Sequence, residues 1–255
     1  MISQLNNREG NLDKKIYDCK ICKNKGQIYY LKEENKGTFY EDEEYVKDCE
    51  CLKKRRTIEN MRNNGLLKVF DTKTLDLFKT PSNWHKNVKN KAIEYIKTGK
   101  NEWFLFSGTV GCGKTHLATA ISIELFNKGL SFHYMQFSGD IVRLTHNMNN
   151  YNEKIKTEAD EEFNKLLNVD LLYIDDFLKI SEYDKTVTKQ TVFTLINNRY
   201  INNKKTIITT EFGMADLLQY DSAVGSRIIE KAKGYILDFT NISVEEKNNL
   251  NWRLR

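Results

Sequence analysis

The sequence has 255 residues, 40% of them hydrophobic and 29% charged, which allows one large domain or a medium domain plus a small one. Its formal net charge of +5 permits an anionic partner without requiring one. No apolar run approaches the roughly 18 residues of a membrane span, and residues 1–15 contain no hydrophobic segment typical of a signal peptide, so we expect a cytoplasmic protein.

Cysteines are concentrated near the N-terminus, with four of the five in the first 51 residues. A C-x-x-C pair precedes a turn and a candidate strand at 27–31. After a second turn, a returning strand is expected within 39–46, and a C-x-C pair closes the segment. Short-spaced pairs flanking a hairpin are typical of a zinc ribbon, where a thiolate site replaces a core too small to fold alone. We therefore predict a structural Zn²⁺ site formed by Cys19, Cys22, Cys49 and Cys51.

The second cysteine pair departs from the usual C-x-x-C spacing, and a redox-active C-x-x-C is the alternative interpretation. A redox pair should open a helix after a strand, and it leaves Cys49 and Cys51 unexplained. A catalytic zinc ion is not expected, because four thiolates leave no open coordination position.

Residues 52–69 follow the cysteine segment. Their apolar residues recur at roughly helical spacing, so we predict a connecting helix that Asn64 and Gly65 interrupt. A basic cluster at its start fits either a nucleic-acid contact or a solvated helix face; it consists of Lys53, Lys54, Arg55 and Arg56.

The pattern G-x-x-x-x-G-K-T occupies residues 108–115. A strand candidate at 103–106 precedes it and a helix candidate at 114–127 follows it, which is the context of a phosphate-binding loop. Glycines let backbone N–H groups approach phosphates, and the helix N-terminus adds partial positive charge. Lys114 is predicted to contact the β/γ-phosphates of ATP, and Thr115 to bind Mg²⁺. The candidate ATP-binding residues here are Gly108, Thr109, Val110, Gly111, Cys112, Gly113, Lys114, Thr115 and His116, with Cys112 interpreted as a small filler.

Strands and helices alternate through the rest of the chain. We predict an amphipathic helix at 84–97 with Val88, Ala92, Ile93 and Ile96 facing inward. Further strands are expected at 130–137, 171–175, 205–210 and 235–239, and helices at 138–149, 158–167, 188–200, 214–219 and 222–231, with a polar loop at 149–157. This alternation predicts a three-layer α/β domain with a parallel sheet.

The strand at 171–175 ends in two adjacent carboxylates. Asp175 is predicted to hold Mg²⁺ opposite Thr115, and Asp176 to orient the attacking water or accept its proton. A polar turn is the alternative interpretation of the pair.

Four segments together resemble the replicative helicase loaders of bacteria and phages, the DnaC/DnaI-like AAA+ ATPases, to which the IstB-type transposition ATPases are similar. They are GCGKTHLA at 111–118, LLYIDDF at 171–177, TIITTE at 206–211 and AVGSRI at 223–228. The resemblance implies a P-loop AAA+ domain without a full helical lid, since only 28 residues follow Arg227. The expected boundaries are a zinc-binding partner module at 1–54, a linker helix and entry segment at 55–80, and an ATPase domain at 81–255.

The resemblance also implies roles for single residues. Arg227 matches the arginine finger that reaches ATP in a neighbouring subunit, which implies a homo-oligomer in the ATP state. Most AAA+ proteins have Asp-Glu where this chain has Asp175-Asp176, so slow hydrolysis is expected. Glu211 or Thr210 occupies the position of the γ-phosphate sensor, which is often Asn in relatives.

The function expected from these features is ATP-dependent loading of a DnaB-like replicative helicase onto single-stranded DNA. The zinc module would bind the helicase, and the ATPase domain would contact DNA. Candidate phosphate contacts are Arg143, Lys154 and Lys156, which also fit solvated surface. Two alternatives remain: a transposition helper ATPase whose partner is a transposase, and a nucleotide-gated binding module with negligible turnover.

Overall fold

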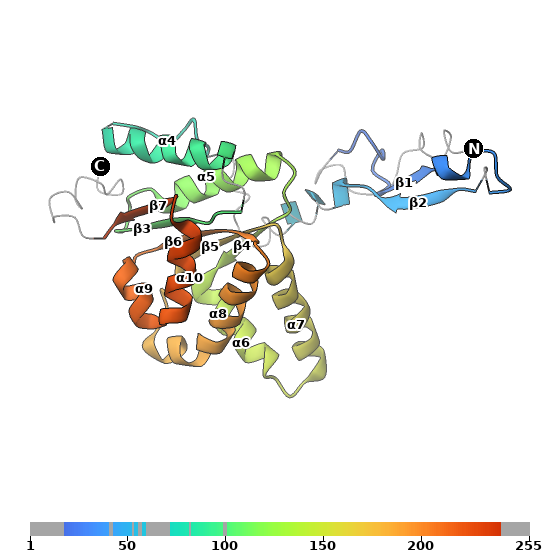
Figure 1. Cartoon of the computed structure of the whole chain (residues 1–255). Helices are drawn as coiled ribbons and strands as arrows, with labels where there is room; N and C mark the ends of the chain where they lie inside the picture. The colour runs from blue at the N-terminus through green and yellow to red at the C-terminus, as the bar shows by residue number, and fades with distance from the viewer. Residues whose placement is uncertain are drawn as a thin grey trace. The chain divides into compact units, whose positions relative to one another are not determined.

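The computed structural model describes residues 18–40, 43–52, 54–55, 58–59, 72–81, 83–98 and 101–240 (Figure 1). The chain divides into two compact units, Met1–Asn63 and Asn64–Arg255. Most of the predicted connecting helix, and residues 241–255, on which the predicted absence of a lid depends, lie outside the described residues.

The first unit contains an antiparallel hairpin. Strand β1 (Gln27–Tyr30) pairs with β2 (Tyr45–Asp48), and Gln27 lies opposite Asp48. A short 3₁₀ helix, η1 (Glu33–Asn35), follows β1. The predicted hairpin is therefore present, but its second strand begins later than predicted.

Phe39 and Tyr40, predicted as the start of the returning strand, lie in a turn. The Thr38 hydroxyl donates a hydrogen bond to the Asn35 carbonyl and accepts one from the Tyr40 N–H. The Asn35 side chain also donates to the Tyr40 carbonyl. These local side-chain bonds compete with strand pairing, so the turn extends past two residues whose composition favours a strand.

The second unit is built on a five-stranded parallel sheet with the order β4-β5-β6-β3-β7. Because β3 is inserted between β6 and β7, the first strand of this sheet in the sequence lies inside it. Strands β3, β5 and β6 are buried along almost their whole length, as expected for a sheet covered on both faces. The strands are β3 (Phe104–Gly108), β4 (Phe132–Gln136), β5 (Leu171–Phe177), β6 (Lys205–Thr210) and β7 (Ile236–Phe239).

Helices cover both faces of this sheet, so the predicted three-layer α/β fold is confirmed. Figure 1 shows α4 (Asn83–Thr98) and α5 (Lys114–Asn127) on one face. The other face carries α6 (Phe137–Met148), α7 (Glu153–Asn168), α8 (Glu182–Ile201), α9 (Met214–Tyr220) and α10 (Ser222–Ala232).

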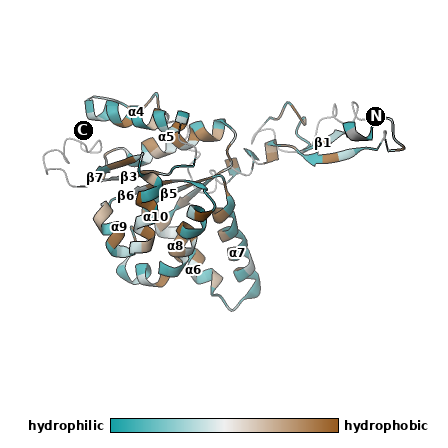
Figure 2. Cartoon of the chain, viewed as in Figure 1, coloured by the Kyte–Doolittle hydropathy of each residue, from teal (hydrophilic) through white to brown (hydrophobic). Residues whose placement is uncertain are grey.

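A hydrophobic core fills the space between the sheet and helices α6–α10. Leu105, Leu172 and Ile208 come from three neighbouring strands and are fully buried. Phe163 of α7 and Ile196 of α8 pack into the same cluster. Figure 2 shows both hydrophobic and hydrophilic residues around α7, as expected for a helix with one buried face.

Two helices begin earlier than predicted because polar residues cap them. The Asn152 side chain accepts hydrogen bonds from the N–H groups of Lys154 and Ile155, so α7 starts at Glu153. Ser181 caps α8 in the same way through the N–H of Asp184. The predicted loop at 149–157 is therefore mostly helix.

The inward face of α4 also differs from the prediction. Val88 and Ala92 are buried, but Ile93 and Ile96 are only half-buried. Tyr95 is fully buried instead, and its hydroxyl donates to the Glu102 carbonyl. Tyr95 was not predicted to be buried because tyrosine carries a polar hydroxyl, although its ring can pack in a core.

Candidate functional site

The loop between β3 and α5 has the backbone of a phosphate-binding loop. Gly111 and Gly113 have φ angles of 80° and 91°, a region that side-chain-bearing residues rarely adopt. A Cβ atom on Gly113 would also lie 3.1 Å from the Phe78 ring. Glycine is therefore required at 113 both by the backbone angle and by the close approach of Phe78.

Lys114 is held inside the curve of this loop. Its buried ammonium donates hydrogen bonds to the carbonyls of Gly108 at 2.8 Å and Thr109 at 2.9 Å. These contacts keep the charge next to the backbone that would surround phosphates, where it can bind the β/γ-phosphates.

A bulge in β5 places both carboxylates of the acidic strand in the same region. Ile174 pairs with Ile208 and Phe177 with Thr210, so Asp175 and Asp176 together stand opposite the single residue Thr209. The Thr209 hydroxyl donates to Asp175 and accepts from the N–H of Asp176 at 3.2 Å. In a regular strand the two side chains would point to opposite faces.

Hydroxyl groups surround Asp175, which is buried. Thr115 donates to it at 3.3 Å, Tyr173 at 2.7 Å and Tyr134 at 3.2 Å, in addition to Thr209. Burial, and then the nearby Asp175 charge, raise the pKa of both tyrosines, so each phenol stays protonated and donates. The Thr115–Asp175 contact is the arrangement expected of a Mg²⁺ site.

Asp176 faces a lysine that sequence reasoning did not identify. The Lys179 ammonium lies 2.7 Å from Glu211 and 3.4 Å from Asp176. The hydrogen bond to Glu211 raises the pKa of Lys179 most, and Asp176 adds to the shift, so Lys179 is a cation at neutral pH. The sequence shows only a lysine three residues after an acidic pair; its position depends on the turn that follows β5.

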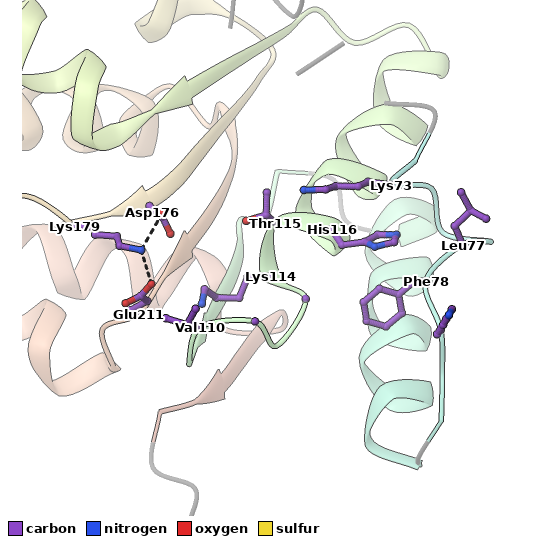
Figure 3. A pocket seen from close by; sticks show the side chains of 13 residues that line it. Lys73, Leu77, Phe78, Val110, Lys114, Thr115, His116, Asp176, Lys179 and Glu211 are labelled. Carbon is purple, nitrogen blue, oxygen red and sulfur yellow. Dashed lines mark hydrogen bonds and ion pairs between the residues drawn. The ribbon is translucent and has the colours of Figure 1, made fainter. Parts of the chain in front are cut away.

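Asp176, Lys179 and Glu211 line a cavity of about 410 Å³, whereas the buried Asp175 lies behind Thr115 and is not among the lining residues (Figure 3). Asp176, Lys179 and Glu211 lie at one end, Leu77 and Phe78 at the other, with Lys114 and Thr115 between them. His116 lies near Phe78, with ring centroids 5.3 Å apart. Its Nε2 is 2.9 Å from the Thr74 carbonyl, and burial lowers its pKa. The cavity therefore has a charged end and an aromatic end.

The other predicted ATP-binding residues divide into two groups. Val110, Gly111 and Gly113 line the cavity with Lys114, Thr115 and His116. Gly108, Thr109 and Cys112 do not line it: the first two offer their carbonyls to Lys114, and the side chain of Cys112 is fully buried. At the predicted sensor position, the Thr210 hydroxyl donates to the Phe177 carbonyl, and Glu211 faces the cavity. Glu211 is therefore the better-placed of the two candidates.

Arg227, the predicted arginine finger, lies on α10 and does not line this cavity. Its guanidinium donates to the Ala223 carbonyl at 2.8 Å and stacks over the rings of Phe193 and Tyr200 at 5.5 and 5.6 Å. Its Nε is buried without a hydrogen-bond partner. A role in its own subunit's cavity is not supported by this position.

The predicted DNA contacts differ in availability. Arg143 forms a bidentate ion pair with Glu162, at 2.8 and 2.6 Å, and a further contact with Asp140. Lys154 and Lys156 are exposed on the first turn of α7. Tyr151, in the turn before α7, is fully exposed.

The four predicted zinc ligands of the first unit come together. Their sulfur atoms lie within 4.8 Å of one another, and Cys19–Cys49 and Cys22–Cys51 are 3.8 and 3.4 Å apart. A tetrahedral site with Zn–S bonds of about 2.3 Å places its sulfurs about 3.8 Å apart. All four side chains are buried, so the cluster fits a tetrahedral thiolate site.

Hydrogen bonds around the cluster support this arrangement. The Gly26 N–H donates to the Cys22 sulfur at 3.3 Å, as occurs around metal thiolates. Although burial opposes it, this bond and the neighbouring thiols lower the pKa of Cys22 to about 7. Buried Asn24 accepts from the Cys19 N–H and from Arg55, which ties the first cysteine to the segment after the last one.

The sheet order, the phosphate-binding loop and the acidic strand define an ATP-binding protein of the P-loop AAA+ class. Residues 30–238, most of the chain, match a single protein family. The chain belongs to the IstB-like ATP binding proteins.

Known proteins support this assignment. The chain is 28% identical over 208 residues to YqaM of Bacillus subtilis, covering 76% of this chain and 63% of YqaM. It is 25% identical to the replicative helicase loader DnaC of Escherichia coli, covering 72% and 71% of the two chains. The crystal structure of the DnaC helicase loader shares the fold, with a TM-score of 0.57 at 24% identity over 68% of this chain and 99% of that one. The expected resemblance to helicase loaders is confirmed at the level of family and fold.

None of the helices in the described part of the chain has the length and hydrophobicity needed to cross a bilayer.

Proposed function

We propose that this protein is an ATP-dependent loader of a ring-shaped, DnaB-like replicative helicase onto single-stranded DNA. The observation that carries the proposal is the presence of two units in one chain: an AAA+ nucleotide cavity and a compact four-cysteine module. The sequence similarity to DnaC supports this function over other AAA+ activities.

ATP would occupy the cavity with its base at the aromatic end. Leu77 and Phe78 offer apolar contacts to a purine, and Lys114 lies where the β/γ-phosphates would bind. Thr115 and Asp175 would hold Mg²⁺, which offsets the charge of the phosphates when bound.

Hydrolysis would depend on Asp176 and on a neighbouring subunit. Asp176 lines the cavity and can orient a water molecule or accept its proton. Its side chain is one methylene shorter than the usual glutamate, so we expect slow turnover. Because Arg227 does not line its own cavity, it would complete the site of an adjacent copy in a homo-oligomer.

We propose that the cysteine cluster binds Zn²⁺ and that its module binds the helicase. The cysteine module carries exposed apolar side chains, which suit a protein contact better than a solvated surface. Phe39 is 97% exposed and packs edge-on against Tyr40, while Ile21 is 69% exposed.

Single-stranded DNA would contact the turn before α7. An exposed aromatic ring next to lysines fits a strand of stacked bases with a phosphate backbone. Tyr151 offers the ring, and Lys154 and Lys156 the charges. Arg143 would first have to leave its ion pair with Glu162.

Two alternatives have specific support. The family match to IstB-like proteins favours a transposition helper ATPase whose partner is a transposase. The pairing of Asp176 with Lys179 favours a nucleotide-gated binding module with negligible turnover. Steady-state ATPase rates of the wild type, Lys114→Ala and Arg227→Ala with single-stranded DNA separate the last alternative, which predicts background turnover in all three.

Affinity capture tests the proposal directly. The purified full-length chain is mixed with its organism's ring helicase, and separately with a transposase encoded nearby, with ATP, with ADP or without nucleotide. The proposal predicts a stable complex with the helicase that Phe39→Ala weakens without changing zinc content. An exposed residue far along the chain, Tyr183, 73% exposed, supplies the matched control Tyr183→Ala, which should bind normally. Absence of helicase binding under every nucleotide condition would contradict the proposal.

A further inference from the structure

Besides Lys114, the cavity is lined by Lys73, Lys79 and Lys179, and Lys179 is the one that faces the acidic residues. The Lys179 ammonium lies between two carboxylates, 2.7 Å from Glu211 and 3.4 Å from Asp176 (Figure 3). All three side chains line the cavity. Lys179 thus holds the carboxylate predicted to orient water and the residue at the predicted sensor position.

The backbone after β5 is shaped to bring Lys179 into this place. Asp176 and Leu178 have φ angles of 55° and 65°, although neither is glycine. Such angles are uncommon, especially for leucine, and they concentrate at functional sites. The Lys179 N–H bonds to the Asp176 carbonyl at 3.1 Å, while Phe177 and Leu178 are almost fully buried. The buried side chains of Phe177 and Leu178 therefore fix the turn, and this turn places the Lys179 side chain in the cavity.

The contacts of Lys179 are of a kind that a phosphate can replace. Its side chain is 48% exposed, and those of Asp176 and Glu211 are 34% and 30% exposed. Ion pairs with this much solvent contact contribute little to stability, so exchanging a carboxylate for a phosphate costs little. A terminal phosphate carries more charge than a carboxylate and offers three acceptor oxygens.

The position of Lys179 corresponds to the last phosphate of the nucleotide. With the base at Leu77 and Phe78, and Lys114 at the β/γ-phosphates, the end lined by Lys179 is the farthest from the base. ATP reaches that end with its γ-phosphate, and ADP is one phosphate shorter. Without Lys179, two uncompensated carboxylates would face the γ-phosphate and repel it.

We propose that Lys179 is a γ-phosphate ligand that distinguishes ATP from ADP within one subunit. When ATP binds, the ammonium exchanges Asp176 for the γ-phosphate and leaves Asp176 available to orient water. With ADP, the pairing to Asp176 and Glu211 persists. This inference rests on the proposed binding of ATP in the cavity.

The test compares the affinities of Mg²⁺-loaded ADP and a non-hydrolysable ATP analogue, measured by titration calorimetry on the full chain. Lys179→Met should weaken binding of the analogue about tenfold and change ADP binding by less than about twofold. Lys179→Arg keeps the charge and should stay close to wild type. Lys189→Met is the matched control, because Lys189 is 52% exposed and also forms a surface ion pair, with Asp221.

Glu211→Gln provides a test of opposite sign. It removes one competitor for Lys179 and one negative charge, so the preference for the ATP analogue over ADP should rise about threefold. If the wild type binds both nucleotides and Lys179→Met changes the two affinities equally, or changes neither, this inference is overturned while the proposed function stands. A wild-type chain that binds neither nucleotide would overturn the proposed function as well.

Discussion

The two units differ in what holds their candidate sites in place. In the nucleotide-binding unit, a large buried core fixes the strands and helix that carry the phosphate-binding loop and the acidic residues. In the cysteine unit, the buried cluster within the described residues consists of the four cysteines with Ile28 packed against it. We therefore expect the nucleotide-binding unit to fold without its ligand, whereas the cysteine unit would depend on the proposed Zn²⁺ for the contacts that a core would supply.

Removal of the proposed zinc ion should therefore give the largest effect on stability, and this effect should be confined to the cysteine unit. We expect loss of the metal, by a strong chelator or Cys49→Ser, to remove on the order of 10 kcal/mol and to unfold the cysteine unit. Proteolysis and hydrogen exchange at residues 18–52 report this unit, while tryptophan fluorescence reports the other, which contains Trp84 and Trp103. Loss of both signals together would show that the units do not fold independently.

Arg199→Leu should do the reverse and damage the nucleotide-binding unit. The fully buried guanidinium donates to the carbonyls of Leu166, Val169 and Lys205, and burial lowers its pKa to about 9, so it remains charged at neutral pH. Its loss leaves these carbonyls buried without donors, at a cost of about 4 kcal/mol in unfolding free energy. Urea unfolding followed by tryptophan fluorescence measures the loss. Lys189→Leu, on the same helix but exposed, is the control, and a similar loss there would refute the explanation.

Lys114→Ala should remove nucleotide binding while leaving both units folded. The ammonium bonds to two loop carbonyls that glycine-rich backbone can expose to water, so we expect little change in stability. ATP affinity should fall about 100-fold, since a charged contact to phosphate is lost. Calorimetric titration with ATP measures the change, and undiminished affinity would mean that ATP does not bind at this loop.

Acidification should destabilise the nucleotide-binding unit through His133. Burial lowers the pKa of His133 to about 4, so between pH 6.5 and 4 the unfolded chain binds the proton more readily than the folded one. Stability is therefore lost as the pH falls through this window, by about 2 kcal/mol after allowance for partial solvent contact. His133→Gln should flatten the difference in urea midpoint between pH 7 and pH 4.5. An identical pH dependence in the variant would assign the effect to other groups.

The sequence predicts best what one contiguous segment determines. The phosphate-binding loop needs only the order of its glycines, Lys114 and Thr115, and α5 has the predicted bounds of Lys114 to Asn127. The cysteine cluster could also be predicted from the sequence, because two short-spaced cysteine pairs in one short segment indicate a shared metal site.

What the sequence does not reveal depends on contacts between distant segments or on unusual backbone angles. Tyr134 reaches Asp175 from a neighbouring strand, 41 positions away, and no local pattern marks it. Lys179 reaches the cavity only because Asp176 and Leu178 adopt left-handed angles. The early start of α7 depends on the cap at Asn152, which a hydrophobic period cannot detect.

Transfer of the helicase onto circular single-stranded DNA is the decisive measurement of helicase loading. A closed helicase ring cannot thread onto a closed circle of single-stranded DNA, so transfer onto the circle requires the ring to be opened. We expect the wild-type chain with ATP to deposit the helicase on the circle, measured as co-purification of helicase and DNA after a high-salt wash. Lys114→Ala and the zinc-depleted chain should both fail. Loading at the same rate without this protein, or with both altered forms, would show that the protein is not an ATP-dependent helicase loader.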